Sequence, residues 1–309
     1  MRKSLRLTAL ASVAVLTVAA CGGGATPIPA PTAAPTAAPG TQAPATEAPA
    51  PTVDPNSLLG KVMAAGKIVM STDPQYPPQS SLKSDGTYEG FDIDVGTEIA
   101  KRLGVKLEFA TPDWNIITAG SWSGRWDFSV GSMTITTPRE KVLAFSKPYY
   151  FTPAQIAVST ASGITTLDGL AGKVICTGEA TTYFDWLSGT LDLGSYTPKS
   201  KPPPGSTATT LSTDRLCAEA WKAGRKDFDG WLSSSTTVEA AVTDGLPLVK
   251  VGAPAFFEPL GVAFDKSGPD PTGIVVKVNR ILDEMRADGT LKGFSEKWFG
   301  LDLTVGQGT

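Results

Sequence analysis

The residues best placed to do chemistry in this chain are concentrated in one short segment, residues 126–139, with the sequence WDFSVGSMTITTPR. Its apolar start, residues 128–130, is typical of a buried strand, and the Gly-Ser-Met-Thr sequence that follows predicts a turn. Such a turn exposes backbone N–H and C=O groups, to which Ser132 and Thr134 add hydroxyls. Arg139 adds a planar fork of donors that matches a carboxylate. The segment therefore indicates a grip for a small zwitterion, although a strand end with an arginine paired to a surface acid would show the same residues.

The composition narrows the class of protein. The chain has 309 residues, of which 41% are hydrophobic, enough for a core spread over one to three domains. The net charge is −3, and no basic stripe suggests a nucleic-acid partner. Histidine is absent, which excludes His-based triads and His-ligated metals, and the cysteines are too few for an all-Cys zinc site. We therefore expect no metal site and no cofactor.

The N-terminus has the pattern of a targeting segment. Residues 1–6 carry three basic side chains, and residues 7–18 form an apolar stretch too short to span a bilayer. The sequence VAAC at residues 18–21 resembles the lipobox at which bacterial lipoproteins are cleaved before a lipidated cysteine, here Cys21. An ordinary secretory signal, cleaved after the two alanines, is the alternative. Residues 1–20 are thus predicted to be a signal peptide, and the mature protein to be attached by this lipid to the extracytoplasmic face of the cell membrane.

Residues 21–55 consist mainly of Gly, Ala, Pro and Thr and have almost no large apolar side chains. Such a composition cannot bury enough surface to fold, so we predict a disordered tether. No later hydrophobic run has membrane-spanning length, so the membrane is expected to be a partner through the lipid anchor only.

Two further cysteines, Cys176 and Cys217, lie in the predicted folded part. In an oxidising compartment an even pair is a disulfide candidate. The first falls on a predicted strand and the second on a predicted helix that is expected to cover the same sheet. Two separate buried thiols are the alternative.

The elements that must position the candidate residues alternate along the chain. Strands are predicted at residues 67–71, 106–110, 126–130, 143–146, 155–158, 173–177, 227–232 and 261–264. Helices are predicted at residues 91–103, from residue 114, and at 181–187, 213–223, 271–288 and 291–299. The Pro-rich residues 195–210 are predicted to be an exposed loop. Strand–helix alternation of this kind favours an α/β fold with parallel strands.

Several further motifs occur in a fixed order around the first segment: STDPQYPP at 71–78, GTYEGFDIDV at 86–95, FSKPYY at 145–150, DGTL at 288–291 and KWFG at 297–300. In order, spacing and residue identity they resemble the extracytoplasmic solute-binding proteins of amino-acid ABC transporters (bacterial family 3), over about residues 59–303. The resemblance implies a type II periplasmic-binding-protein-like fold, with two α/β sheets joined by two hinge strands. Lobe 1 would hold residues 56–152 and 254–303, lobe 2 residues 153–253, and residues 304–309 would be a tail.

The resemblance also implies roles for residues of lobe 1. Tyr76 and Trp114 would sandwich the apolar part of the ligand. Arg139 would clamp its carboxylate. The polar head of the ligand would be met by the end of the preceding strand, through the backbone of Gly131 and the side chains of Ser132 and Thr134.

In lobe 2 the resemblance points to the turn formed by residues 178–181, at the start of a helix. Backbone N–H groups there would bind the same carboxylate, assisted by the Thr181 hydroxyl. An ordinary N-cap is the alternative for this threonine. Glu179 is unexpected in an anion site, and it would either point to solvent or meet a cationic group of the ligand.

The main departure from the family concerns the aspartate that holds the α-ammonium group. Counted five residues from Asp227, its position falls on Leu232, followed by Ser233. Asp229 would lie on the other face of a regular strand. The ammonium partner is therefore open: Asp229, Glu179 or Asp73 replaces it, or the ligand lacks a standard α-amino group.

The expected function is that of a receptor, and no catalytic residue is predicted. A carboxylate-bearing solute, expected to be an amino acid, would bind between the lobes of a monomer, and the closed form would dock on an ABC transporter permease. A ligand-sensing surface module is one alternative. A dehydratase-type enzyme on the same fold is another, for which Asp73, Glu179 and Asp229 are the acid–base candidates.

Overall fold

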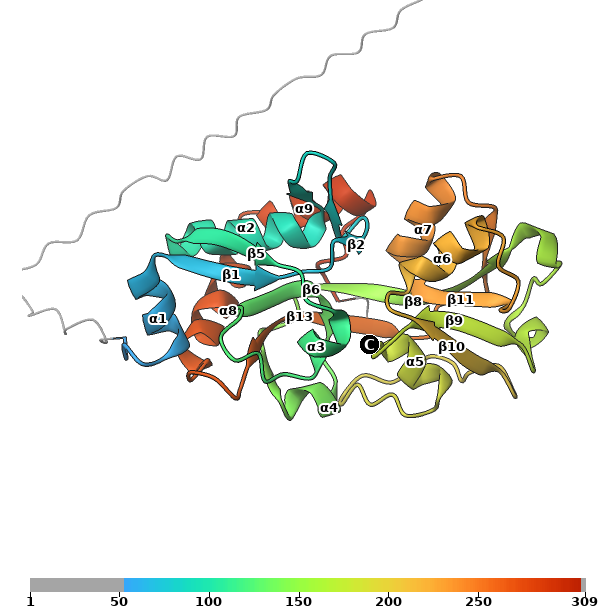
Figure 1. The fold of residues 1–309 in the computed structure, drawn as a ribbon, viewed down its shortest axis with the longest axis horizontal. Helices are drawn as coiled ribbons and strands as arrows, with labels where there is room; N and C mark the ends of the chain where they lie inside the picture. Colours follow the sequence, from blue (N-terminus) through green and yellow to red (C-terminus); the bar gives the residue numbers. More distant parts are fainter. Residues whose placement is uncertain (1–52, 307–309) are drawn as a thin grey trace, which may run out of the picture. The chain divides into compact units, whose positions relative to one another are not determined.

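The computed structural model describes residues 53–306, which form a mixed α/β structure (Figure 1). The predicted signal peptide, Cys21 and most of the predicted tether lie outside the described residues. The helices are α1 (Leu58–Ala65), α2 (Phe91–Leu103), α3 (Trp114–Thr118), α4 (Thr137–Glu140), α5 (Thr182–Leu187), α6 (Arg215–Lys222), α7 (Ser235–Thr243), α8 (Thr272–Ala287) and α9 (Thr290–Phe299). The strands are β1 (Lys67–Ser71), β2 (Gln75–Tyr76), β3 (Ser80–Leu82), β4 (Tyr88–Glu89), β5 (Lys106–Ala110), β6 (Phe128–Thr134), β7 (Leu143–Phe145), β8 (Tyr150–Ser159), β9 (Val174–Gly178), β10 (Thr207–Leu211), β11 (Gly230–Ser234), β12 (Leu248–Val251) and β13 (Phe257–Asp265).

Ten of these strands form one hydrogen-bonded sheet. Eight of them follow one another in the order β10-β9-β11-β8-β13-β6-β1-β5, and β12 pairs with β8 and β7 with β13 off this path. The strands β1, β5 and β6 are parallel, as are β9, β10 and β11. The long strands β8 and β13 run antiparallel to each other and join the two parallel groups. The two expected sheets are therefore linked by direct pairing of the hinge strands, from Tyr150 with Leu260 to Pro153 with Phe257.

The buried apolar side chains divide into two pairs of clusters. One pair draws on residues 58–150 and 260–303, and we call this part lobe 1. The other pair draws on residues 154–256, and we call this part lobe 2. Helices cover both faces of the sheet in each lobe; in lobe 2, for example, α6 and α7 lie on one face and α5 on the other (Figure 1). This is the two-lobed α/β architecture that the sequence predicts.

The long helices follow the apolar periodicity of the sequence. Helix α8, which lies within the helix predicted at residues 271–288, buries Ile274, Val278, Ile281, Leu282 and Met285 on one face. Helix α2 ends at Gly104, which has a positive φ of 78° and donates its N–H to the last turn. The predicted range of this helix, residues 91–103, is confirmed.

Two predictions about local structure are wrong. Residues 131–134 are the second half of strand β6 and not a turn, because β13 continues the pairing as far as Leu260 opposite Thr134. The predicted loop 195–210 is wrong at its end, where residues 207–210 belong to strand β10, because residues 207–211 pair in parallel with β9 at the sheet edge. Both segments form strands because they pair with strands that are distant in sequence.

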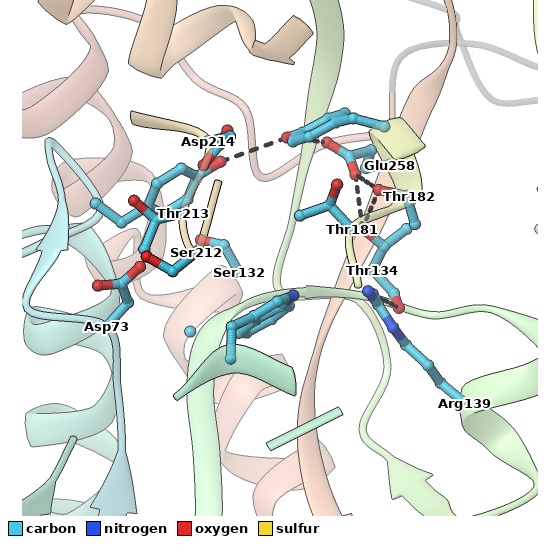
Figure 2. A pocket seen from close by; sticks show the side chains of 14 residues that line it. Asp73, Ser132, Thr134, Arg139, Thr181, Thr182, Ser212, Thr213, Asp214 and Glu258 are labelled. Carbon is cyan, nitrogen blue, oxygen red and sulfur yellow. Dashed lines mark hydrogen bonds between the residues drawn. The ribbon is translucent and has the colours of Figure 1, made fainter. Parts of the chain in front are cut away.

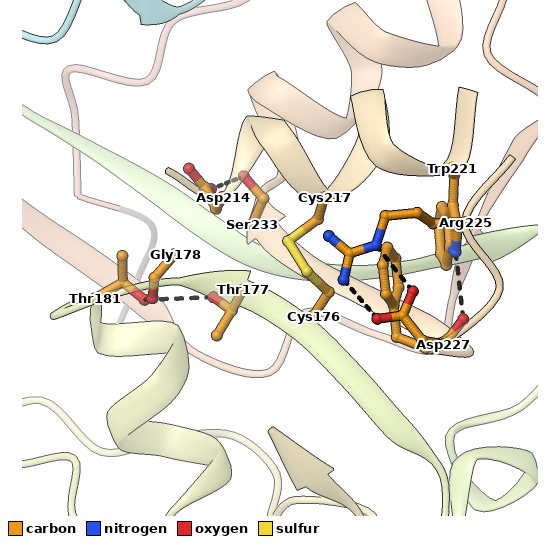
Figure 3. Close-up of a disulfide and its surroundings, with 11 residues drawn as sticks. Cys176, Thr177, Gly178, Thr181, Asp214, Cys217, Trp221, Arg225, Asp227 and Ser233 are labelled. Atoms are coloured by element: carbon orange, nitrogen blue, oxygen red, sulfur yellow. Dashed lines mark hydrogen bonds and ion pairs between the residues drawn. A yellow bond between two sulfur atoms is a disulfide. The ribbon is translucent and has the colours of Figure 1, made fainter. Parts of the chain in front are cut away.

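Cys176 on β9 and Cys217 on α6 are joined by a disulfide, both buried (Figure 3). Figure 3 places this bond beside the turn of Gly178 and Thr181, which follows β9, and beside Asp214, which precedes α6. The bond therefore joins the two segments of lobe 2 that point toward lobe 1. Across residues 53–306, no helix is long and apolar enough to cross a membrane.

Candidate functional site

A pocket lies between the two lobes, and Figure 2 shows the side chains around it. Its walls come from the segment after β1, from β2, from the end of β6, and from α3 and α4 on lobe 1; from the start of α5 and the segment before α6 on lobe 2; and from the hinge strand β13. The residues that line it are Asp73, Tyr76, Trp114, Gly131, Ser132, Thr134, Arg139, Thr181, Thr182, Tyr183, Ser212, Thr213, Asp214 and Glu258. All seven residues that the sequence proposes with most support lie in this set.

Arg139 is the positive charge of the pocket, and it is almost completely buried, with 8% of its surface exposed. Its guanidinium group donates to the carbonyl oxygen of Thr134 at 3.0 Å and to that of Ala180 at 2.9 Å. It also lies over the ring of Trp114, at 5.5 Å from the ring centre. These contacts fix the direction of the guanidinium plane, which is needed for two-pronged binding of a carboxylate.

The aromatic walls come from both lobes. Trp114 begins α3, and its indole N–H donates to the carbonyl oxygen of Ala180 at 3.2 Å. The hydroxyl of Tyr76 lies 3.4 Å from that of Tyr183. Gly131 lies beneath the indole, because a Cβ atom at this position would be 3.8 Å from the Trp114 ring. A third aromatic residue, Tyr183, lines the pocket together with the predicted pair of Tyr76 and Trp114. No sequence motif pointed to it.

The hydroxyl groups expected to meet the ligand are engaged with buried carboxylates. Ser132 donates from its hydroxyl to Asp92 at 2.7 Å, and Thr134 donates to Glu258 at 2.7 Å. Burial raises the pKa of Asp92 to about 7, although its hydrogen bonds from Ser132 and Tyr149 act in the opposite direction. Asp92 lies in the first turn of α2, and its carboxylate fixes the side chain of the pocket residue Ser132.

Thr181 is both a helix cap and a pocket residue. Its hydroxyl accepts from the Phe184 N–H at 3.3 Å, as an N-cap does, and donates to the Gly178 carbonyl at 2.8 Å. Gly178 permits a close approach of the two lobe 2 segments, since a Cβ atom there would lie 2.8 Å from the Asp214 nitrogen. The turn is therefore packed directly against the start of α6.

Asp214 is a pocket residue to which no sequence motif pointed. It precedes α6 in the N-cap position, yet its carboxylate makes no capping hydrogen bond. One carboxylate oxygen instead accepts from the hydroxyl of Ser233, at the end of β11. Burial, and the nearby carboxylates of Asp73 and Glu258, raise the pKa of Asp214 to about 7. In sequence, an aspartate before a helix is typical of a cap, so no local pattern distinguishes it.

Glu258 is another acid that the motifs missed, and it lies on the hinge strand β13 with 2% of its surface exposed. Its carboxylate accepts from Tyr183 at 2.8 Å, and from Thr134 and Thr182 at 2.7 and 2.5 Å. Burial raises its pKa, while these hydroxyls and the charge of Arg139 oppose that rise. One sequence signal could have indicated Glu258: it is a single acid within the apolar run FFEPLGVAF. A charged side chain in a buried strand requires polar or charged partners.

The four weaker candidates have different positions. Asp73 lines the pocket, and burial raises its pKa. Glu179 is exposed and lines an outer pocket that continues from the inner one. Asp229 lies outside both pockets and is paired with Lys173 at 3.4 Å, so it does not replace the missing aspartate. Ser233 is buried and contacts the pocket through Asp214.

The lobes contact each other directly across the pocket. Gln79 of lobe 1 donates to the hydroxyls of Ser234 and Thr236 of lobe 2, at 3.2 and 2.6 Å. It accepts from Thr237 at 3.3 Å. Together with the two bonds to Ala180, these contacts define a closed arrangement of the lobes. Among residues 53–306, no group of three or more acidic, Cys or His side chains is arranged to hold a metal ion.

Comparison with known proteins identifies this architecture. Residues 68–301 match the family of bacterial extracellular solute-binding proteins, family 3, and the chain belongs to that family. It is 30% identical over 250 residues to the L-cystine-binding protein TcyJ of Escherichia coli K12, covering 80% of this chain and 88% of that protein. It is 30% identical over 241 residues to the probable amino-acid-binding protein YxeM of Bacillus subtilis, covering 77% and 86%.

A solved structure supports the same conclusion. The ancestral amino-acid-binding protein AncCDT-1, a precursor of cyclohexadienyl dehydratase, matches with a TM-score of 0.66 and 30% identity, covering 79% of this chain and 100% of that one. The fold is that of two-lobed periplasmic amino-acid-binding proteins, as predicted. The named relatives are binding proteins, so we regard this chain as a solute-binding protein and not as an enzyme.

Proposed function

We propose that this protein is an extracytoplasmic receptor that binds an amino acid between its lobes. The observation that carries the proposal is the set of residues that line the pocket. Arg139 of lobe 1 supplies a positive charge, and both lobes and the hinge strand supply carboxylates. Tyr76, Trp114 and Tyr183 supply aromatic surface. An amino acid has a carboxylate for the arginine and an ammonium group for the acids. The names of the relatives, cystine-binding and amino-acid-binding, agree with this ligand class.

In this mechanism Arg139 clamps the ligand carboxylate, and Tyr76 and Trp114 cover its apolar part. Charged hydrogen bonds of this kind contribute ~1.5–3 kcal/mol each. The ammonium group is attracted by Asp73, Asp214 and Glu258, which take the place of the aspartate expected on β11. Since the ligand touches both lobes, it favours the closed state over the open one, which is the requirement for ligand-driven closure.

The closed form would then deliver its solute to the permease of an ABC transporter. Lipid attachment at Cys21 and the tether of residues 21–55 would keep the receptor beside that permease as a monomer. This part of the proposal rests on the sequence of the N-terminal region and on the family.

A thermal-shift screen tests the binding function. The purified protein is melted with each of the twenty amino acids, L-cystine and a set of small carboxylates without an amino group. A ligand at ~1,000 times its dissociation constant adds ~4 kcal/mol to the free energy of unfolding. For a protein of this size the melting temperature then rises by roughly 8–16 °C. No shift with any amino acid would contradict the proposal.

A further inference from the structure

The charges around the pocket do not balance for a neutral amino acid. Three carboxylates line the inner pocket, those of Asp73, Asp214 and Glu258, against the single guanidinium group of Arg139. A zwitterion brings one carboxylate for Arg139 and one ammonium group for the three acids. Two of the three carboxylates would then have no cation, and Asp214 and Glu258 are buried, where a charge without a partner is costly.

The excess charge is concentrated at one end of the pocket. In Figure 2, Asp73 and Asp214 lie on the side opposite to Arg139, while Glu258 lies nearer the arginine. Asp73 belongs to lobe 1 and Asp214 to lobe 2, and the carboxylate of Asp73 contributes to the raised pKa of Asp214. Closure therefore brings two like charges from opposite lobes toward each other.

Both aspartates have an oxygen available for a ligand. Within residues 53–306, Asp73 accepts one hydrogen bond, from the Gln75 N–H at 2.8 Å, and Asp214 accepts from Ser233 on one oxygen. Glu258, by contrast, accepts from hydroxyls on both of its oxygens. A cationic group would thus find its direct partners at the Asp73–Asp214 end.

The outer pocket, like the Asp73–Asp214 end of the inner one, carries an excess of negative charge. The outer pocket shares Asp73, Trp114, Ser212 and Thr213 with the inner one, and adds the carboxylates of Asp113 and Glu179. No Lys or Arg lies among the described residues that line this outer pocket. An acidic entrance concentrates cations and speeds their association.

We propose that the cleft selects an amino acid whose side chain carries a positive charge, and that Asp214 together with Asp73 receives that charge. This inference rests on the proposed amino-acid binding and adds the class of side chain. It gives Asp214 a role in specificity, with Ser233 as the residue that positions it.

Matched ligands test the proposal in the unmodified protein. L-arginine is compared with L-citrulline, and L-ornithine with L-glutamine, pairs of similar shape that differ in side-chain charge. Dissociation constants are measured by calorimetry at about pH 8, where Asp214 is mainly ionised. We expect the cationic member of at least one pair to bind at least tenfold more tightly, and its association rate to fall more steeply with salt. Equal or tighter binding of the neutral members would overturn the proposal.

Two variants then locate the effect. Asp214→Asn should reduce the preference for the cationic ligand at least tenfold, because the lost charge weakens binding of the cationic ligand more than binding of the neutral one. The control is Asp227→Asn, the same change on the same lobe at an exposed acid paired with Arg225; it should leave both affinities unchanged. A preference that survives Asp214→Asn would contradict the role of Asp214.

The outcomes separate this inference from the proposed function. Arg139-dependent binding of neutral amino acids alone would leave the receptor function standing and remove the cationic specificity. Absence of binding by every amino acid would contradict both proposals.

Discussion

Arg139 on lobe 1 donates a hydrogen bond of 2.9 Å to the carbonyl oxygen of Ala180 on lobe 2. Ala180 has a positive φ of 53°, which turns this carbonyl toward the cleft at the start of α5. The residue proposed to clamp the ligand is therefore also a direct link between the lobes. The proposed function therefore makes ligand binding and closure depend on the same side chain.

The first prediction concerns this arginine. Arg139→Ala should weaken amino-acid binding by ~2–5 kcal/mol, at least tenfold in affinity, because the carboxylate of the bound amino acid loses its positively charged partner. Calorimetry with the ligand found in the screen measures the change. The control is Arg280→Ala on the exposed side of α8, which should bind as the unmodified protein does. Unchanged affinity in Arg139→Ala would contradict the carboxylate clamp.

A second prediction concerns closure without direct ligand contact. Gln79→Ala removes three hydrogen bonds between the lobes, each worth about 0.5–1.5 kcal/mol. Because Gln79 does not line the pocket, we expect faster ligand dissociation with little change in the association rate. Stopped-flow fluorescence of the pocket tryptophan would report both rates. An unchanged dissociation rate would show that these bonds do not hold the lobes together.

The third prediction concerns the disulfide. Replacing Cys176 and Cys217 by serine removes a cross-link between two residues that are 41 positions apart in the sequence. On a chain-entropy basis, this should lower the free energy of unfolding by ~4 kcal/mol. For a protein of this size the melting temperature should fall by roughly 8–16 °C. Affinity should also fall, because the bond holds the Gly178 turn against the segment that carries Asp214. A variant with unchanged melting would indicate that the thiols are not joined in solution.

The fourth prediction follows from buried acids. Asp92 and Asp214 have pKa values of about 7 in the folded protein, raised mainly by burial, whereas their unfolded values are near 3.8. Between these values the folded state binds more protons than the unfolded state, so stability should increase as pH falls from about 8 to about 5. Calorimetric melting without ligand would measure this trend. Below about pH 4 the trend should reverse, because Asp265 and Asp288 have lowered pKa values.

Ligand affinity should follow the opposite trend. A cationic side chain requires the ionised form of Asp214, so binding should weaken as pH falls through about 7. The Asp214→Asn variant should lose this part of the pH dependence. A pH profile identical to that of the unmodified protein would contradict the proposed role.

The fifth prediction tests the anchor. Cys21→Ser should abolish lipid attachment and release the protein from the membrane fraction, because stable anchoring requires acyl chains. Fractionation of cells that express the unmodified and the variant chain would measure this. Ligand binding by the variant should be unaffected, and membrane retention of the variant would contradict lipidation at this cysteine.

Much of the fold and part of the site followed from the sequence alone. Apolar periodicity was sufficient for helices such as α8, because burial of one helix face is a local repeat. The motif order was sufficient to select Tyr76, Trp114 and Arg139, which all line the pocket. The absence of histidine and the scarcity of cysteine narrowed the possible chemistry by composition alone, because a residue type that is missing cannot be supplied by folding.

Tertiary structure decided the remainder. Strand β10 and the second half of β6 exist because distant strands pair with them, and no local pattern encodes such a partner. Asp214 has the sequence of a helix cap, and only the packing of α6 against β9 and β11 turns its carboxylate into the cleft. Glu258 becomes a pocket acid because hydroxyls from both lobes converge on the hinge strand. Side-chain type is fixed by sequence, but the charge balance of a cleft depends on which distant segments the fold brings together.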